Sequence, residues 1–295
     1  MPLKGTITAL ITPFKDGQLH EEGLIQNIRA QINAGINGLL MLGSTGEAHT
    51  LSSEEQVRVI TLTVNEAKGK VPVLIGTGHN CTKQTIEKSQ QAQKLGADGI
   101  VVVTPYYNKP SQEGIFKHYE ALSQNVSLPI YLYNVPGRSG INIELPTLLR
   151  LAGLPHLAGI KDASGSVSQM ADTFYAIRQK HPAFSIFCGD DALTLPMMAL
   201  GAKGVMSVVS NLVPKQVAEL VTYAANGRFD LAQKLHYQLL PLFQIAFVEV
   251  NPVPIKAAME MCGLSAGECR LPLCGLLPEN RQKLLHVLQT MQLTK

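Results

Sequence analysis

The side chains able to do chemistry in this 295-residue chain follow short apolar segments that read as β-strands. They comprise the hydroxyls of Ser44, Thr45, Thr104 and Ser207, the phenols of Tyr106, Tyr107 and Tyr133, Arg138, Lys161, and the carboxyls of Asp162, Asp190 and Asp191. In an α/β barrel, such strand ends and the loops after them surround one site. An amine with phenols, hydroxyls and a guanidinium suits covalent chemistry on a carbonyl compound that carries a carboxylate.

Lys161 is the candidate nucleophile. It lies in the apolar run LAGIKDAS, where burial would lower its pKa from about 10.4 and leave a neutral amine able to attack a carbonyl. A lysine that reaches solvent from the strand end, or that pairs with Asp162, is the structural alternative. Lys203 lies in a helix-to-strand joint and Lys256 on a predicted outer helix, so both are weaker candidates.

Tyr133 is the candidate proton carrier, because its strand is predicted to lie beside that of Lys161. A phenol next to a Schiff-base lysine can move the proton released when a carbinolamine dehydrates. A core tyrosine with a satisfied hydroxyl is the more common fate of a strand tyrosine.

Two further features suit carboxylates. The run GSTGE (43–47) offers backbone N–H groups and two hydroxyls in a glycine-bounded turn, although a plain loop explains it equally well. Arg138, after a Pro-Gly turn, could bind a second carboxylate through two hydrogen bonds, although a lone surface arginine is usually only solvated. The pair Asp190-Asp191 is weaker evidence, since it could simply cap the next helix.

Composition and motifs argue against several other classes of protein. Lys and Arg number 25 against 22 Asp and Glu, so the net charge is +3, which argues against a dedicated nucleic-acid or anionic-membrane surface. No apolar run approaches the roughly 20 residues of a membrane span, and the amino terminus does not resemble a signal peptide. Few histidines or carboxylates cluster, so neither a metal site nor a Ser-His-Asp hydrolase is supported. The five cysteines lack CxxC spacing and suggest incidental thiols in a reducing cytoplasm.

Eight apolar segments alternate with helical patterns and must position these side chains. The segments are 6–14, 38–45, 71–78, 99–107, 129–136, 157–164, 184–191 and 204–211. Most are apolar at consecutive positions, which is typical of parallel strands covered on both faces by helices. Helices are predicted at 21–34 and at 53–68, the second beginning with a capping box of Ser53 and Gln56.

Three helix-to-strand joints share one pattern, in which a glycine ends the helix in a left-handed turn: AGINGLL, LGADGIV and LGAKGVM. Eight such units predict an α/β fold, a (β/α)₈ barrel over residues 1–225. A doubly wound sheet is the competing architecture. Residues 226–295 show only helical patterns and predict a C-terminal α-helical domain.

The motifs GSTGE, YYNKP, YNVPGRSG, GIKDASG and GDDAL, with the later NPVPIK and RLPL, resemble the pyruvate-dependent class I aldolases. This family includes dihydrodipicolinate synthase and N-acetylneuraminate lyase, and the resemblance covers essentially the whole chain. It implies a lyase without cofactor or metal, in which Lys161 forms a Schiff base with pyruvate and Tyr133 moves the proton. Ser44 and Tyr107 would complete the hydroxyl relay, with Tyr107 offered across the interface of a homo-oligomer, a dimer of dimers. Thr45 and the backbone carbonyl of Met206 would hold the pyruvyl group, and Arg138 the carboxylate of the aldehyde.

The identity of the aldehyde depends on Arg138. An arginine there fits aspartate 4-semialdehyde and the synthesis of diaminopimelate and lysine, whereas the sialate lyases lack it because their aldehyde is a neutral sugar. Ser44 departs from the usual Gly-Thr-Thr motif and keeps the hydroxyl while losing the β-branch. The alternatives are another pyruvate-dependent aldolase, such as N-acetylneuraminate lyase or a keto-deoxy-sugar aldolase, and a non-catalytic barrel that senses a keto acid.

The resemblance also implies a possible effector site for lysine. The matching positions are Ala48, His49, Ser53, Gln56, Asn80, Gln84 and Tyr106. Asn80 and Tyr106 fit the inhibited pattern, but Gln84 replaces a glutamate and Gln56 a histidine. We therefore expect weak or absent inhibition by lysine.

Overall fold

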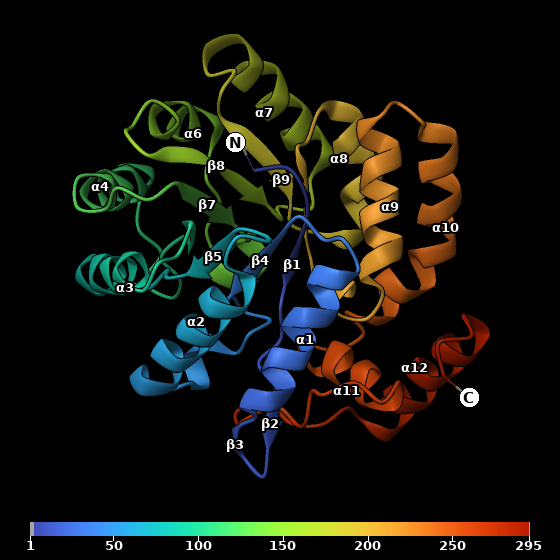
Figure 1. The fold of residues 1–295 in the computed structure, drawn as a ribbon. Helices are drawn as coiled ribbons and strands as arrows, with labels where there is room; N and C mark the ends of the chain where they lie inside the picture. Colours follow the sequence, from blue (N-terminus) through green and yellow to red (C-terminus); the bar gives the residue numbers. More distant parts are fainter. Residues whose placement is uncertain (1–2, 295) are drawn as a thin grey trace.

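Eight parallel strands close into a barrel in the computed structural model, which describes residues 3–294 (Figure 1). They are β1 (Gly5–Ala9), β4 (Gly38–Met41), β5 (Val73–Gly76), β6 (Gly99–Val103), β7 (Ile130–Asn134), β8 (Leu157–Asp162), β9 (Ser185–Cys188) and β10 (Gly204–Ser207). Each lies within or overlaps one of the eight predicted segments. β1 pairs with both β4 and β10, so the barrel is confirmed and the doubly wound sheet was the wrong alternative.

A ring of helices covers the outside of the barrel (Figure 1). The helices are α1 (Glu21–Asn33), α2 (Ser53–Ala67), α3 (Thr82–Lys94), α4 (Gln112–Ser123), α5 (Pro136–Ser139), α6 (Leu145–Leu151), α7 (Val167–Lys180), α8 (Thr194–Leu200) and α9 (Pro214–Ala225). Short 3₁₀ turns η1 (Ala48–Thr50), η2 (Asp191–Leu193) and η3 (Val209–Asn211) follow three strand ends.

The strands are apolar at consecutive positions because each face packs against a different layer. Inside the barrel lie Ile7, Leu40, Leu74, Val101, Tyr131, Phe187 and Met206. The alternate residues of the same strands, such as Leu39, Ile75 and Ile100, pack against the helices in a second and larger cluster. Burial on both faces explains why these segments do not alternate between apolar and polar residues.

The three glycine joints adopt the predicted left-handed turn, with φ of 83° at Gly35, 89° at Gly96 and 112° at Gly201. The predicted capping box of α2 was wrong by one position. Ser52 is the N-cap and pairs with Glu55, since Ser53 already belongs to the helix. Gln56 is therefore free for other contacts.

A small hairpin was not predicted. β2 (Phe14–Lys15) and β3 (Gln18–Leu19) pair antiparallel around Asp16 and Gly17. Both turn residues have positive φ, 51° and 73°, as a two-residue hairpin turn requires. Strands of two residues are too short to leave a periodic pattern in the sequence.

The carboxyl-terminal part is helical, as expected. Within residues 226–294 the structure has α10 (Phe229–Ile245), α11 (Val253–Met261) and α12 (Pro278–Thr290) and no strand. α10 lies beside α9, and α12 packs against α10 and α11 (Figure 1). The division into domains at residue 225 stays a prediction.

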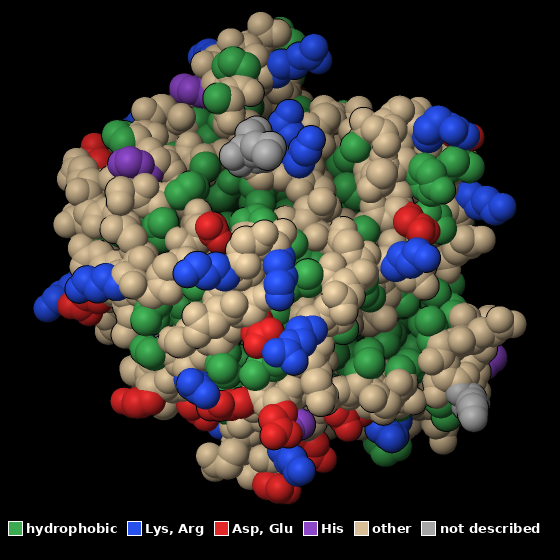
Figure 2. Space-filling model, in the orientation of Figure 1, with side chains coloured by type: hydrophobic (Ala, Val, Ile, Leu, Met, Phe, Trp, Pro, Cys, Tyr) green, Lys and Arg blue, Asp and Glu red, His purple; other side chains and the backbone are tan. Residues whose placement is uncertain are grey.

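Charged side chains of both signs are interspersed on the face shown in Figure 2, with acidic ones gathered near the lower edge. None of the helices in residues 3–294 is both long and apolar enough to cross a membrane.

Candidate active site

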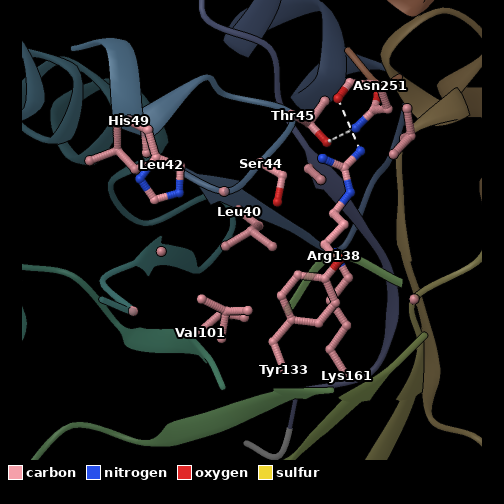
Figure 3. A pocket seen from close by; sticks show the side chains of 18 of the residues that line it. Leu40, Leu42, Ser44, Thr45, His49, Val101, Tyr133, Arg138, Lys161 and Asn251 are labelled. Atoms are coloured by element: carbon pink, nitrogen blue, oxygen red, sulfur yellow. Dashed lines mark hydrogen bonds between the residues drawn. The ribbon is translucent and has the colours of Figure 1, made fainter. Parts of the chain in front are cut away.

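One cavity at the carboxyl ends of the strands brings together five of the predicted residues. Ser44 and Thr45 follow β4, Tyr133 lies on β7, Arg138 on α5 and Lys161 on β8, and all five line the same space (Figure 3). The other charged or titratable lining residues are His49 and Lys88, and no Asp or Glu of the described chain lines the cavity. The site therefore presents hydrogen-bond donors and positive charge to a ligand.

Lys161 is 5% exposed, and burial lowers its pKa to about 8. It makes no ion pair with Asp162, whose carboxylate instead accepts a hydrogen bond from the Ser164 N–H at 2.7 Å. Both structural alternatives for this lysine, solvent exposure and pairing with Asp162, are therefore wrong. A buried amine with a pKa near neutrality is available as a nucleophile.

Tyr133 and Lys161 are register partners on neighbouring strands. The Lys161 Nζ lies 4.3 Å from the centre of the Tyr133 ring. Burial raises the pKa of Tyr133 to about 12, which the charge of Arg138 opposes. The phenol thus holds its proton at neutral pH and stands beside the amine.

The loop after β4 has a strained backbone at both ends. Leu42 and Glu47 have φ of 55° and 49°, in the left-handed region that non-glycine residues rarely adopt. The N–H groups of Ser44 and Thr45 donate to no acceptor among residues 3–294. Free N–H groups beside two hydroxyls suit a carboxylate, as the sequence predicted for this turn.

The sequence analysis did not identify Asn251 as a residue of the site. Its Nδ2 donates to the Thr45 hydroxyl at 2.9 Å, and its backbone carbonyl accepts from Arg138 Nη2 at 3.0 Å (Figure 3). It thereby connects the two groups predicted to bind carboxylates. Its segment NPVPIK carried the family resemblance but no chemical signal of its own.

A buried ion pair behind the same loop was also missed. Lys256 and Glu47 are 2.8 Å apart, with side chains 2% and 1% exposed. The Lys256 Nζ also donates to the carbonyls of Thr12 and Glu268, at 3.1 and 3.0 Å. Glu47 accepts from the Arg270 N–H at 2.9 Å. The sequence correctly placed Lys256 on an outer helix, α11, but gave no sign that its side chain is buried.

Two of the residues predicted for catalysis or substrate binding do not line the cavity. Tyr107 is 88% exposed and has φ of 72°, so within one chain it does not join Ser44 and Tyr133. Met206 is fully buried on β10 and is not among the lining residues. Their predicted roles remain predictions.

The possible effector cleft is continuous with the cavity, because Ala48, His49 and Gln56 line it too. Gln56 donates to the carbonyls of Ala48 and Leu51, at 3.0 and 3.1 Å, and accepts from Lys88 Nζ at 3.1 Å. The cleft thus contains an ammonium of its own, which the sequence analysis did not identify. Asn80 and Gln84 do not line the cavity.

The Tyr106 ring in this region contacts two histidines edge-on, His49 at 5.3 Å and His79 at 6.1 Å between ring centres. Burial and the nearby charge of Lys88 lower the pKa of both histidines. His49 and Lys88 line the cavity together without an Asp or Glu of residues 3–294 among its lining residues, so this part of the cavity is a poor place for a cation.

Thiols and potential metal ligands are scattered. All five cysteines are unpaired, with Cys188 buried and Cys81 and Cys274 exposed. Residues 3–294 contain no group of three or more His, Cys, Asp or Glu side chains arranged to hold a metal ion.

The chain is similar to known proteins along almost its whole length. A model of the dihydrodipicolinate synthetase family matches residues 2–291. The 4-hydroxy-tetrahydrodipicolinate synthase of Protochlamydia amoebophila is 51% identical over 98% of this chain and 96% of its own.

Solved structures agree with this finding. The dihydrodipicolinate synthase of Thermotoga maritima is 39% identical and superposes with a TM-score of 0.97, over 99% of this chain and 100% of its own. A chloride-inhibited dihydrodipicolinate synthase from Acinetobacter baumannii, solved in complex with pyruvate, is 39% identical with a TM-score of 0.95, over 99% of both chains.

Proposed function

The chain belongs to the dihydrodipicolinate synthetase family, and we propose that it condenses pyruvate with L-aspartate 4-semialdehyde to give 4-hydroxy-tetrahydrodipicolinate. The reaction is that of a lyase in diaminopimelate and lysine biosynthesis. The observation that carries the proposal is Lys161, a buried amine with a pKa near 8 beside the Tyr133 phenol. The relatives compared with this chain are named for the same activity, and none of these findings favours an N-acetylneuraminate lyase or a sensor.

Schiff-base formation is the first step. The neutral Lys161 Nζ attacks C2 of pyruvate, and the carbinolamine loses its hydroxyl as water to leave a cationic imine. Tyr133, which keeps its proton at neutral pH, supplies the proton that the leaving hydroxyl needs and takes one back later. Loss of a C3 proton then gives the enamine, whose C3 attacks the aldehyde carbon of the semialdehyde. The amine of the semialdehyde then attacks C2 and displaces Lys161 Nζ, which closes the ring and frees the enzyme.

Two sets of donors hold the carboxylates. The Thr45 hydroxyl accepts from Asn251, so its own proton is free to donate to the pyruvate carboxylate together with the free N–H groups of Ser44 and Thr45. The Met206 carbonyl completes the pyruvyl site in this proposal. Arg138 takes the carboxylate of the semialdehyde, which a neutral sugar aldehyde lacks.

The enzyme is, in this proposal, a cytoplasmic homo-oligomer in which Tyr107 completes the relay of a neighbouring chain. Support comes from its 88% exposure and left-handed backbone, which are unfavourable for an aromatic residue unless a partner covers it. Mixing the inactive variants Tyr107→Phe and Lys161→Ala should restore part of the activity through hybrid sites. A fully active monomer in sedimentation analysis would exclude the shared site.

Inhibition by lysine is proposed to be weak or absent. Gln56 is not the capping partner that the sequence suggested, because Glu55 makes the capping box with Ser52. Support comes instead from Lys88, whose ammonium already occupies the hydrogen-bond acceptor of Gln56 and repels a second ammonium.

Borohydride trapping tests the proposal directly. Pyruvate with borohydride should add one reduced pyruvyl group per chain, and peptide mass mapping should locate it on Lys161. Consumption of aspartate 4-semialdehyde, and no release of pyruvate from sialate, should separate the two aldolase activities. Labelling of Lys203 or Lys256 in place of Lys161, or no labelling, would falsify the assignment.

A further inference from the structure

A buried carboxylate lies behind the wall of the cavity and has no task in the mechanism above. Asp191 begins η2 and is 2% exposed. It does not line the cavity, whereas Gly189 and Val208, its neighbours in space, do. The sequence suggested a helix-capping pair, but only Asp190 caps, through its hydrogen bond from the Ala192 N–H at 2.9 Å.

The hydrogen bonds of Asp191 fit the ionised form. Its two oxygens accept from the Ser207 hydroxyl and from the N–H groups of Val208 and Val209, the latter two at 2.9 and 3.2 Å. The Ser207 oxygen itself accepts from the Ser210 N–H at 2.9 Å, so its proton points to Asp191. Burial raises the pKa of this carboxyl, and the three donors oppose the rise.

Asp191 is close to Lys161 because β8 and β9 run side by side. Lys161 pairs with Phe187 and Asp162 with Cys188. At the next residue, a Cβ on Gly189 would lie 3.1 Å from Lys161 Cγ, so the chain passes directly against the lysine stem. Asp191 follows two residues later and accepts a hydrogen bond from the N–H of Val208, which lines the cavity together with Lys161.

The charged and titratable groups around Lys161 act in opposite directions. Asp191 and Cys188 favour its ammonium form and raise its pKa, whereas burial and Arg138 lower it. Tyr133, Asp162 and Asp190 are the remaining titratable groups nearby, and Asp190 acts on Tyr133. No carboxylate of residues 3–294 lines the cavity, so no side chain inside it supplies a second negative charge to Lys161.

We propose that Asp191 is the fixed counter-charge of the cationic imine that Lys161 forms with pyruvate, an inference that rests on the proposed function. When Nζ bonds to C2 and water leaves, the nitrogen gains a positive charge that the free amine lacked. A buried, hydrogen-bonded carboxylate stabilises this charge without having to reorganise. Asp191 touches no substrate and is a positioning residue that acts on the reaction through Lys161.

Loss of this charge has two effects of known sign. The free amine loses a group that favours protonation, so the pKa of Lys161 falls further and the rate of adduct formation, which depends on the neutral amine, rises at lower pH. The imine loses its counter-charge, so more pyruvate is needed at pH values where the amine is already neutral. A general loosening of the site would not shift the pH midpoint of the adduct-formation rate downward.

Asp191→Asn removes the negative charge of the side chain and keeps its size and shape. The amide oxygen can accept from Val208 and Val209, and the amide nitrogen can donate to the Ser207 oxygen. Asp172→Asn on α7 is the matched control, because it makes the same change at an exposed carboxylate. The measurements are the initial rate of adduct formation, trapped with borohydride, as a function of pH, and the amount of adduct at high pH as a function of pyruvate concentration.

In the wild type the rate of adduct formation should rise with pH, with a midpoint near pH 8. In Asp191→Asn the midpoint should fall by about one unit, and half-saturation at high pH should need about tenfold more pyruvate. Asp172→Asn should match the wild type in both respects. An Asp191→Asn protein with wild-type values would overturn the inference.

Ser207→Ala provides a second variant, should the first fail to fold. It removes one of the three donors that oppose the rise of the Asp191 pKa, so part of the carboxylate charge should be lost and the midpoint should fall by less than in Asp191→Asn. An unchanged or raised midpoint in Ser207→Ala would count against the inference. If the wild type traps no pyruvate on Lys161, the proposed function fails, and the two failures are thus distinguishable.

Discussion

Two lysines of this chain are buried to a similar degree and have opposite surroundings. Lys161 is 5% exposed and Lys256 is 1% exposed. The Lys256 ammonium has a carboxylate at 2.8 Å and two backbone carbonyls, and it lies 4.4 Å from the centre of the Phe14 ring. Lys161 has no hydrogen-bond partner of its own among residues 3–294, and its nearest ring belongs to a phenol.

The comparison teaches that burial alone does not make a lysine reactive. All three N–H donors of Lys256 are engaged, by two carbonyls and a carboxylate, so this side chain is fixed as a structural hydrogen-bond donor. Lys161 is buried without such partners, and burial lowers its pKa to about 8, which makes the neutral amine accessible. The two lysines also cooperate, since the pair of Lys256 with Glu47 holds the strained loop that carries Ser44 and Thr45.

Removal of the reactive lysine should have the largest effect. Lys161→Ala should lose nearly all activity and form no borohydride adduct, because no other group can supply the covalent electron sink. Lys203→Ala, at an exposed position, is the control and should keep full activity. The contrast between the two buried lysines would be lost if Lys161→Ala still gave an adduct on Lys256.

Removal of the structural lysine should affect stability first. Lys256→Met leaves the Glu47 carboxylate buried without its counter-ion and should lower the free energy of unfolding by about 3–5 kcal/mol. The double variant Lys256→Met/Glu47→Leu should recover most of that loss. Thermal and denaturant unfolding measure both effects.

The control for this prediction is Arg29→Met, which breaks an exposed pair with Glu66. A surface pair contributes about 0–1 kcal/mol, so this variant should change stability little. A Lys256→Met protein as stable as Arg29→Met would mean that the buried pair is unimportant.

Changing the charge near Lys161 should have a smaller effect on catalysis. Arg138→Ala should reduce kcat/KM for the semialdehyde roughly 10- to 150-fold, the effect of losing about 1.5–3 kcal/mol of charge-assisted hydrogen bonding. The pH midpoint of adduct formation should rise, because Arg138 lowers the pKa of Lys161. Arg178→Ala on α7 is the control, and damage to pyruvate trapping equal to that in the semialdehyde step would show that Arg138 shapes the whole site.

Lys88 is intermediate between the two lysines and gives the smallest prediction. It is half-buried with a neutral amide partner, and burial lowers its pKa. Half-inhibition by free lysine should not occur well below about 1 mM, which corresponds to roughly −4 kcal/mol of binding. Lys88→Leu should lower that concentration several-fold by removing a like charge, whereas Lys83→Leu on the exposed side of α3 should not. Strong inhibition of the wild type in initial-rate titrations would contradict this argument.

The sequence by itself determined the barrel and half of the site. Consecutive apolar residues and glycine joints specify parallel strands, and the order of the strands places Tyr133 beside Lys161, because neighbouring parallel strands end at one edge. Each of these inferences needs only local pattern and chain order. The hairpin around Asp16 and the cap at Ser52 escaped prediction because they depend on one or two residues.

Only the tertiary structure decided which polar groups meet. Asn251 and Thr45 are 206 positions apart, and Lys256 and Glu47 are 209 apart. The periodicity of α11 indicates on which face of the helix Lys256 lies, but not that Glu47 is its partner. Asp191 had the sequence position of a capping residue. A buried polar group must find its partner in the packed structure, and that choice depends on how distant elements dock, which periodicity along the chain does not encode.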